Sequence, residues 1–318
     1  MSATELARID LVLARLAWMR ASGIWPNGKR YLWTDAFGLV LLVSLYRTSG
    51  DERFLDEARR LVEDVERVLG RSRGLRIGEA PDRDGQYFHY LAMWIYALDR
   101  LGRIEPEYRR RAIAVVRDVH DAFVTPGIGV AWKMEEDLSG PYPGYGFGAL
   151  DPFHGYVVYR LLDEAALARE DKAFLARALG EMRELVMKSY RSLTITQDLG
   201  LGMMLWFSHF FPAEDWAIVQ RDRSLAMLER MWIDPPGYFC REPRLRSVKF
   251  AFTNYGVAIG LQSVDAMPER VKLLRSFFAN YRSGDEYDTE AITHVMACCA
   301  DFPGELLQHD ASTSSSTG

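Results

Sequence analysis

The stretch DAFGLVLLVSLYRTSGDERFLDEARRLVEDVERVL, residues 35–69, decides the fold. Residues 35–46 are apolar on nearly every side, which is typical of a helix buried all round. A turn signal, Ser49-Gly50-Asp51, follows them. Residues 53–69 then carry a narrow apolar stripe at helical spacing, with charged residues around the rest. The stretch therefore predicts a hairpin of one buried helix and one helix that is exposed on its far side.

The same alternation of helix types recurs along the chain. The buried helices are expected to begin near Asp35, Asp84, Asp151, Asp198, Phe252 and Tyr287. Their amphipathic partners are expected over residues 4–21, 51–69, 105–122, 170–188, 214–231 and 267–281. Strand signals are nearly absent, and the β-branched run Leu193–Thr196 is the main strand candidate.

Six helices of each type predict two concentric rings, an all-α (α/α)6 barrel, or toroid, of six helical hairpins. A four-helix bundle would not need six apolar helices, and an α-solenoid would show closer sequence repeats. No linker divides the chain, so we expect a single barrel domain over residues 1–309. The low-complexity sequence DASTSSSTG at 310–318 predicts a disordered tail.

The composition is that of a globular protein, with 48% hydrophobic and 26% charged residues and a net charge of −5. The absence of a basic patch argues against a nucleic-acid partner. The N-terminus shows no signal pattern, and the apolar run 36–46 is shorter than the ~20 residues that span a bilayer, so no membrane partner is expected. Cys240, Cys298 and Cys299 form no even disulfide framework. These features favour a cytoplasmic protein.

The buried helices open on polar and aromatic residues. The openings read WTDAFG (33–38), DGQYFHY (84–90), LDPFHGY (150–156), TQDLGLGMMLW (196–206), FTNY (252–255) and DEYD (285–288). In a toroid these openings all lie at one end, so we expect their side chains to converge on one rim.

With these openings, the six-hairpin plan resembles six-hairpin glycosidase-like proteins over nearly the whole chain. TQDLGLG is similar to an inner-helix motif of unsaturated glucuronyl hydrolases, in which an Asp precedes Leu-Gly, and LDPFHGY has a similar opening. The two motifs follow one another in a different order from that family, so its catalytic roles are not carried over. The resemblance implies a toroid with a central pocket for a saccharide.

Four aspartates at the openings are the candidate catalytic groups. Glycoside hydrolysis needs two carboxyl groups that face each other across a sugar. We expect Asp151 and Asp198 to form this pair, followed by Asp35 and Asp84. The alternative is that each aspartate caps a helix, since Asp is a favoured N-cap residue. Asp151, which precedes Pro152, fits that interpretation well.

Three histidines in the buried helices carry a second possible chemistry. His89 follows Gln86 by three residues and His154 follows Asp151 by three, which puts each pair on one helix face. Together with His209, they could bind a sugar or transfer protons as in an epimerase, where two histidines flank a sugar carbon. The alternative is a core histidine bonded to a carbonyl group.

Aromatic and polar residues near the openings are expected to bind the substrate. Segment 125–150, which contains the sequence GPYPGYGFG, is long enough to be a lid or a binding loop, or else a plug for one end of the barrel. The expected substrate-binding residues are Trp33, Gln86, Tyr87, His89, Trp132, Tyr145, His154, Trp206, His209 and Asn254. Arg71, Arg73 and Arg76 could hold an acidic group of a substrate, or could belong to an exposed hairpin.

No motif for a metal or a cofactor is present, because Cys240 has no CxxC or HxxxH partner and the glycine pairs lack a Walker lysine. The sequence thus predicts a glycoside hydrolase-like enzyme that acts on a small saccharide by carboxylate general acid/base catalysis. A sugar epimerase, a small-molecule cyclase of the terpenoid type and a non-catalytic binding protein remain alternatives.

Overall fold

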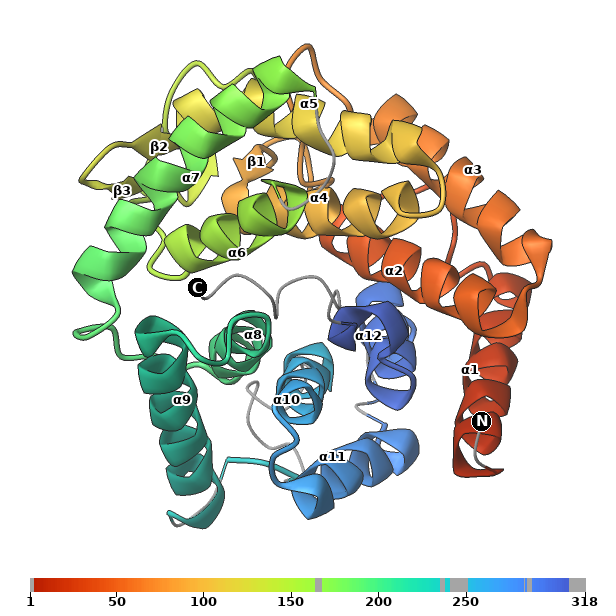
Figure 1. The fold of residues 1–318 in the computed structure, drawn as a ribbon. Coiled ribbons are helices and arrows are strands. Elements are labelled where there is room, and N and C mark those ends of the chain that lie inside the picture. The colour runs from red at the N-terminus through yellow and green to blue at the C-terminus, as the bar shows by residue number, and fades with distance from the viewer. Residues whose placement is uncertain are drawn as a thin grey trace.

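The computed structural model describes residues 3–163, 168–234, 238–240, 251–282, 284 and 288–308. Its helices form two concentric rings (Figure 1). The outer ring consists of α1 (Ala3–Ala21), α3 (Glu52–Leu69), α5 (Pro106–Phe123), α7 (Arg169–Ser189), α9 (Asp215–Ile233) and α11 (Pro268–Asn280). The inner ring consists of α2 (Leu32–Ser49), α4 (Phe88–Gly102), α6 (Asp151–Asp163), α8 (Asp198–His209), α10 (Ala251–Ser263) and α12 (Ala291–Asp301). The predicted (α/α)6 toroid is confirmed.

The predicted helix boundaries need two corrections. Helix α4 begins at Phe88 rather than near Asp84, because residues 86–87 pair as a short strand. Helix α12 begins at Ala291, and the expected start at Tyr287 lies outside the described residues, as does the tail 310–318.

The prediction of a strand at Leu193–Thr196 is wrong, because this segment has no regular secondary structure. The carbonyl of Leu193 instead accepts hydrogen bonds from the side chains of Gln220 and Arg223. The strands lie elsewhere: β1 (Gln86–Tyr87) pairs antiparallel with β4 (Lys133–Met134), and β2 (Val124–Thr125) with β3 (Gly129–Val130).

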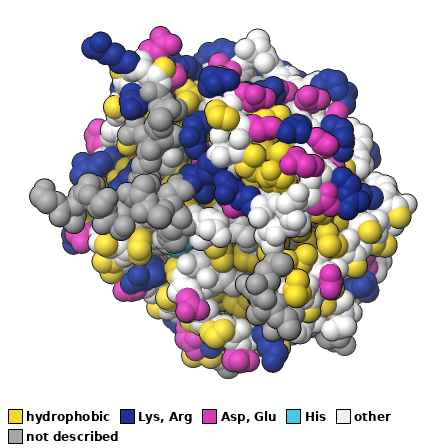
Figure 2. All heavy atoms as spheres, turned by 45° about the vertical axis from the view of Figure 1, so that its right-hand side comes forward, with side chains coloured by type: hydrophobic (Ala, Val, Ile, Leu, Met, Phe, Trp, Pro, Cys, Tyr) yellow, Lys and Arg dark blue, Asp and Glu magenta, His cyan; other side chains and the backbone are white. Residues whose placement is uncertain are grey.

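The two rings differ in burial as their sequences predict. In α2 every residue from Leu32 to Leu45 is buried, whereas in α3 only one stripe of apolar residues is buried. Figure 2 shows basic and acidic side chains interleaved on one face of the molecule. Among the described helices, none is long and apolar enough to cross a membrane. The cysteines Cys240, Cys298 and Cys299 are free thiols.

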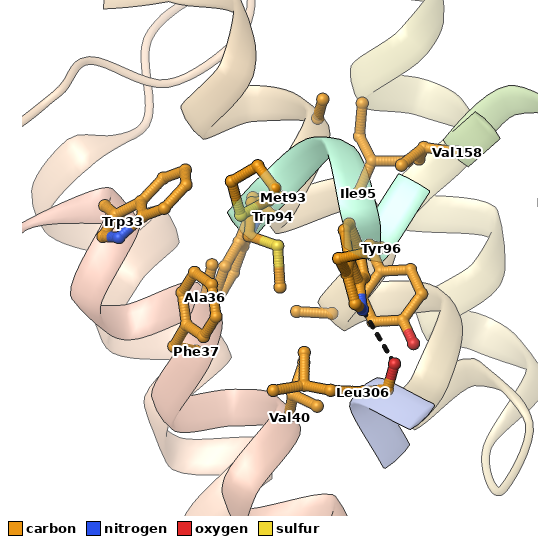
Figure 3. Close-up of a cluster of buried hydrophobic side chains, with 14 of the residues drawn as sticks. Trp33, Ala36, Phe37, Val40, Met93, Trp94, Ile95, Tyr96, Val158 and Leu306 are labelled. Atoms are coloured by element: carbon orange, nitrogen blue, oxygen red, sulfur yellow. Dashed lines mark hydrogen bonds between the residues drawn. The ribbon is translucent and has the colours of Figure 1, made fainter. Parts of the chain in front are cut away.

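A short 3-10 helix, η3 (Gly304–Leu307), closes one end of the barrel. The backbone N–H of Glu305 donates to Ser44, and the carbonyl of Glu305 accepts from the hydroxyl of Tyr96. The carbonyl of Leu306 accepts from the indole of Trp206 at 2.8 Å. In Figure 3, Leu306 lies among buried side chains of α2 and α4. Access to the centre of the barrel is therefore expected from the other end, where the inner helices begin.

Candidate active site

The starts of the inner helices meet at the open end of the barrel, as the sequence predicts. The Trp33 ring of α2 lies 5.9 Å from the His89 ring of α4. His89 in turn contacts Asp151 at the start of α6. On the other side of the barrel, Asp198 of α8 accepts a hydrogen bond from Asn254 of α10. These contacts define a rim that carries most of the predicted site residues.

His89 and Asp151 form the central pair of this rim. The Nδ1 atom of His89 lies 3.5 Å from Oδ1 of Asp151. The side chain of His89 is 27% exposed, whereas that of Asp151 is 5% exposed. The carboxylate thus lies behind the imidazole, as in sites where an acidic group fixes the orientation and tautomer of a catalytic histidine.

Gly148 is needed for the position of Asp151. A Cβ atom at residue 148 would lie 1.5 Å from Oδ2 and 2.6 Å from Cγ of Asp151. The backbone N–H of Gly148 is bonded to the carbonyl of Val130 at 2.9 Å, so the chain is held at this place. The sequence does not single out Gly148, because the close approach of its backbone to the Asp151 side chain is visible only in three dimensions.

Two buried ring nitrogens near His89 lack a hydrogen-bond partner within the described part of the chain: Nε1 of Trp33 and Nε2 of His154. Oδ1 of Asp151 has no hydrogen bond there either, and Nδ1 of His89 lies 3.5 Å from it. Burial, together with nearby His89, holds the pKa of His154 well below its usual range, so this imidazole is neutral. Since buried polar groups are nearly always hydrogen-bonded, the two ring nitrogens suit a ligand with hydroxyl groups.

Aromatic rings continue the site outward from His89. Tyr87 packs against His89, with ring centroids 5.3 Å apart, and also against Trp132 at 5.7 Å. Tyr145 lies 5.3 Å from Trp132. Three of the rings from the expected binding set thus lie together at the rim, and flat apolar faces of this kind suit the faces of sugar rings.

Lys133 supports this aromatic group, although the sequence does not predict it as a site residue. Its side chain is 1% exposed, and Nζ lies 4.2 Å from the ring centroid of Tyr142, 5.0 Å from that of Tyr87 and 5.2 Å from that of Tyr145. Nζ also donates to the carbonyl of Arg83. Lysine is rarely buried, so its position in the sequence suggests an exposed residue.

Asp198 lies in a second polar cluster of the rim. Its Oδ2 accepts hydrogen bonds from the hydroxyl of Thr253 at 2.5 Å and from the amide of Asn254 at 3.2 Å. Burial raises the pKa of Tyr238, and the charge and hydrogen bond of Asp198 raise it further. The partners of Asp198 are side chains of other elements, so the alternative of a simple helix cap does not account for it.

Asp35 is held by residues near the start of α2. It accepts hydrogen bonds from the indole of Trp25 at 2.9 Å and from the backbone N–H of Tyr31 at 3.2 Å, and its Oδ1 lies 3.4 Å from Arg30. Burial raises the pKa of Asp35 to about 6. Asp35 is the fourth residue of α2, whose N-cap is Tyr31, so it is not the N-cap that the alternative interpretation predicts. Its carboxylate is nevertheless bonded within the start of its own helix, and we leave Asp35 out of the proposed site.

Asp84 and Gln86 are occupied by contacts within the loops. Asp84 accepts from Arg76 at 2.5 Å and from the backbone of Gly78 and Gly85. The Gln86 amide accepts from Leu75 and donates to the carbonyls of Arg73 and Glu136. Their polar groups stabilise the chain before α4, and they too are left out.

The neighbouring arginines are engaged in the same way. Arg71 pairs with Glu136 and Arg73 donates to the carbonyl of Asp118, so the hairpin interpretation fits them better than an anion site.

Trp206 and His209 lie at the closed end of the barrel. The indole of Trp206 is bonded to η3, and Nδ1 of His209 contacts the carbonyl of Trp206. They are eight and eleven residues after Asp198, which is about 12–16 Å along the helix. The ring of Trp206 lies 6.0 Å from that of His154, but its indole N–H is bonded to η3, and we leave Trp206 and His209 out of the proposed site.

The comparisons with known proteins support the fold. Neither a family model nor a curated protein matches the sequence of this chain. Among solved structures, a D-mannose isomerase is 11% identical and superposes with a TM-score of 0.58 over 86% of this chain and 87% of its own. The cellobiose 2-epimerase of Bacillus thermoamylovorans is 11% identical, with a TM-score of 0.55 over the same shares.

An alpha-1,6-mannanase of Salegentibacter sp., in an inactive variant bound to alpha-1,6-mannotriose, is 12% identical, with a TM-score of 0.58 over 93% of this chain and 99% of its own. The chain therefore shares the (α/α)6 toroid fold of these enzymes, as the six-hairpin plan of its sequence predicts.

Proposed function

We propose that the protein is a sugar isomerase or epimerase in which His89 transfers a proton next to the carbonyl carbon of an open-chain sugar. The observation that carries the proposal is the exposure of the pair: the side chain of His89 is 27% exposed, whereas that of Asp151, 3.5 Å away, is 5% exposed and lies behind the imidazole. Because Nδ1 faces the carboxylate, Nε2 is the nitrogen left for the substrate.

The reaction needs only proton transfers. Nε2 of His89 removes the proton from C2 of an aldose, and the C–H electron pair forms the double bond of an enediol as the carbonyl oxygen gains a proton. Return of a proton to C1, with loss of the hydroxyl proton from O2, gives the ketose. Return of a proton to C2 from the opposite face, with loss of the proton that O1 had gained, gives the epimer. Trp33 Nε1 and neutral His154, both near His89, are donors suited to the sugar oxygens.

A hydrolase that uses Asp151 and Asp198 is the second candidate. Its support is the second carboxylate at the same rim, held by Thr253 and Asn254. Against it, both carboxylates are nearly buried. The related mannanase is inactivated by replacing two adjacent aspartates, and no two aspartates are adjacent in this sequence.

One experiment separates the two candidates. The protein is incubated in D2O with D-mannose, D-fructose or cellobiose, and NMR follows deuterium entering C1 or C2; release of reducing ends from alpha-1,6-mannotriose is measured in parallel. We expect exchange by the wild type and a rate about 10²–10⁴ times lower in His89→Asn. His294→Asn is the control, because His294 faces Trp18 of α1 instead. Hydrolysis of mannotriose without exchange would favour the second candidate, and neither activity would refute both.

A further inference from the structure

The aromatic group beside His89 extends beyond the proton-transfer site. The indole of Trp132 is 42% exposed, although its ring lies nearly parallel to that of His89, at 26° and a centroid distance of 6.3 Å. Its other ring neighbours are Tyr87 and Tyr145. A large apolar ring exposed next to a polar pocket is a surface that a ligand can cover.

The backbone that carries Trp132 is fixed on both sides. Its N–H donates to the carbonyl of Gly146 at 2.9 Å, and its carbonyl accepts from the N–H of Phe88 at 3.2 Å. The next residue, Lys133, pairs with Tyr87 in the short sheet of β1 and β4. The exposed indole is thus attached to the rim of the barrel itself, which gives it a constant position relative to His89.

Buried Lys133 holds the neighbouring rings in place. Its ammonium group lies against Tyr87 and Tyr145, the two rings that flank Trp132. A cation near the faces of aromatic rings is attracted by their electron density, which opposes their rotation. The flat surface beside the indole is therefore formed before a ligand arrives, so binding needs little reordering.

From these contacts we infer that Trp132 stacks against a second sugar unit, so that the substrate is a disaccharide or longer oligosaccharide with its reducing end at His89. The inference rests on the proposed function, which by itself does not choose between a free monosaccharide and an oligosaccharide. A single sugar unit can provide hydrogen-bond partners for the polar atoms near His89. A second unit would lie outside the pocket, against Trp132.

Equilibrium binding tests the inference without requiring turnover. Calorimetry compares D-glucose with cellobiose and D-mannose with alpha-1,6-mannobiose, using the wild type, Trp132→Ala, Trp132→Phe and Phe147→Ala. We expect the wild type to bind a disaccharide about tenfold or more tighter than its monosaccharide, since stacking on an indole contributes about that factor. Trp132→Ala should lose this preference, and Trp132→Phe should keep part of it.

Phe147 is the matched control. Phe147 belongs to the same segment, and its backbone pairs with that of Ala131 in an isolated β-bridge. Its side chain is 58% exposed, but its ring packs over Gly129. Phe147→Ala should therefore keep the preference for the disaccharide. An equal loss in both variants would mean that the segment as a whole was disturbed and would overturn the role of Trp132.

The failures of the two proposals look different. If monosaccharides bind and exchange deuterium but disaccharides bind no tighter, or if Trp132→Ala keeps the preference, the inference alone is overturned. If disaccharides bind through Trp132 but neither they nor the monosaccharides exchange deuterium, the proton-transfer function fails and the stacking site stands. If no saccharide binds, both fail.

Discussion

The substitution Gly148→Ala should disable the proton-transfer pair without touching either of its members. The added Cβ would lie 1.5 Å from Oδ2 and 2.6 Å from Cγ of Asp151, so the carboxylate must rotate away. Oδ1 of Asp151 is 3.5 Å from Nδ1 of His89. A change of rotamer about the Cα–Cβ bond of Asp151 would move this oxygen out of contact with the imidazole. His89 would then lose the group that fixes its orientation.

The expected magnitude is a deuterium-exchange rate about 10²–10⁴ times lower, the range for a general base that is displaced or wrongly protonated. The free energy of unfolding should fall by about 1–3 kcal/mol, as for other cases of overpacking. Exchange measured by NMR and urea unfolding measured on the same samples keep the two effects apart.

Gly146→Ala is the matched control, because no described atom lies within 4 Å of its added Cβ. Gly148→Ala should also have no further effect on exchange in an Asp151→Ala background, since residues that act through one another are not additive. Exchange near the wild-type rate in Gly148→Ala, or the same loss in Gly146→Ala, would refute the role given to Asp151.

Two further predictions concern stability. Burial raises the pKa of Asp35 from 3.8 to about 6. The pKa of Asp35 is thus higher in the folded than in the unfolded state. Protonation of Asp35 therefore contributes about 3 kcal/mol to the free energy of unfolding below about pH 4, and this contribution is lost as the pH rises through about 6. Asp35→Asn should flatten the unfolding free energy over this range in urea titrations, and an unchanged profile would exclude Asp35 as its source. Trp206→Phe removes the bond to Leu306. The substitution should lower the free energy of unfolding by about 1–2 kcal/mol and lower Tm, while deuterium exchange continues. Loss of exchange in a folded variant would show that Trp206 belongs to the site.

The fold could be predicted because burial alternates along the chain with the period of a helix. Residues 35–46 and 53–69 differ so clearly in their polar content that each is assigned to its ring before any contact is known. The same contrast recurs in every hairpin, so an error at one boundary, such as the start of α4, leaves the architecture unchanged.

The site could be predicted only in part, because the openings indicate which residues reach the rim but not what each one contacts. Asp151 and Asp84 are alike in sequence, each an aspartate before an aromatic residue and a histidine. In the structure Asp84 is bonded to Arg76 and two backbone N–H groups, whereas Asp151 contacts His89. The partners of Asp84 come from the loop before α4, whereas His89 is a residue of α4 itself, and contacts between separate segments leave no periodic signal in the sequence.

Exposure is what favours an imidazole over a carboxylate as the acid–base group of this rim. Structural neighbours with the same fold include an isomerase, an epimerase and a mannanase, so the fold alone does not choose between the two chemistries. A group that transfers a proton must reach the substrate within hydrogen-bond distance. Here His89 is the more exposed member of the pair, and Gly148 leaves the carboxylate of Asp151 room to stay behind it. A hydrolase would require Asp151 to move past the imidazole, whereas an isomerase or epimerase can use the pair as it stands.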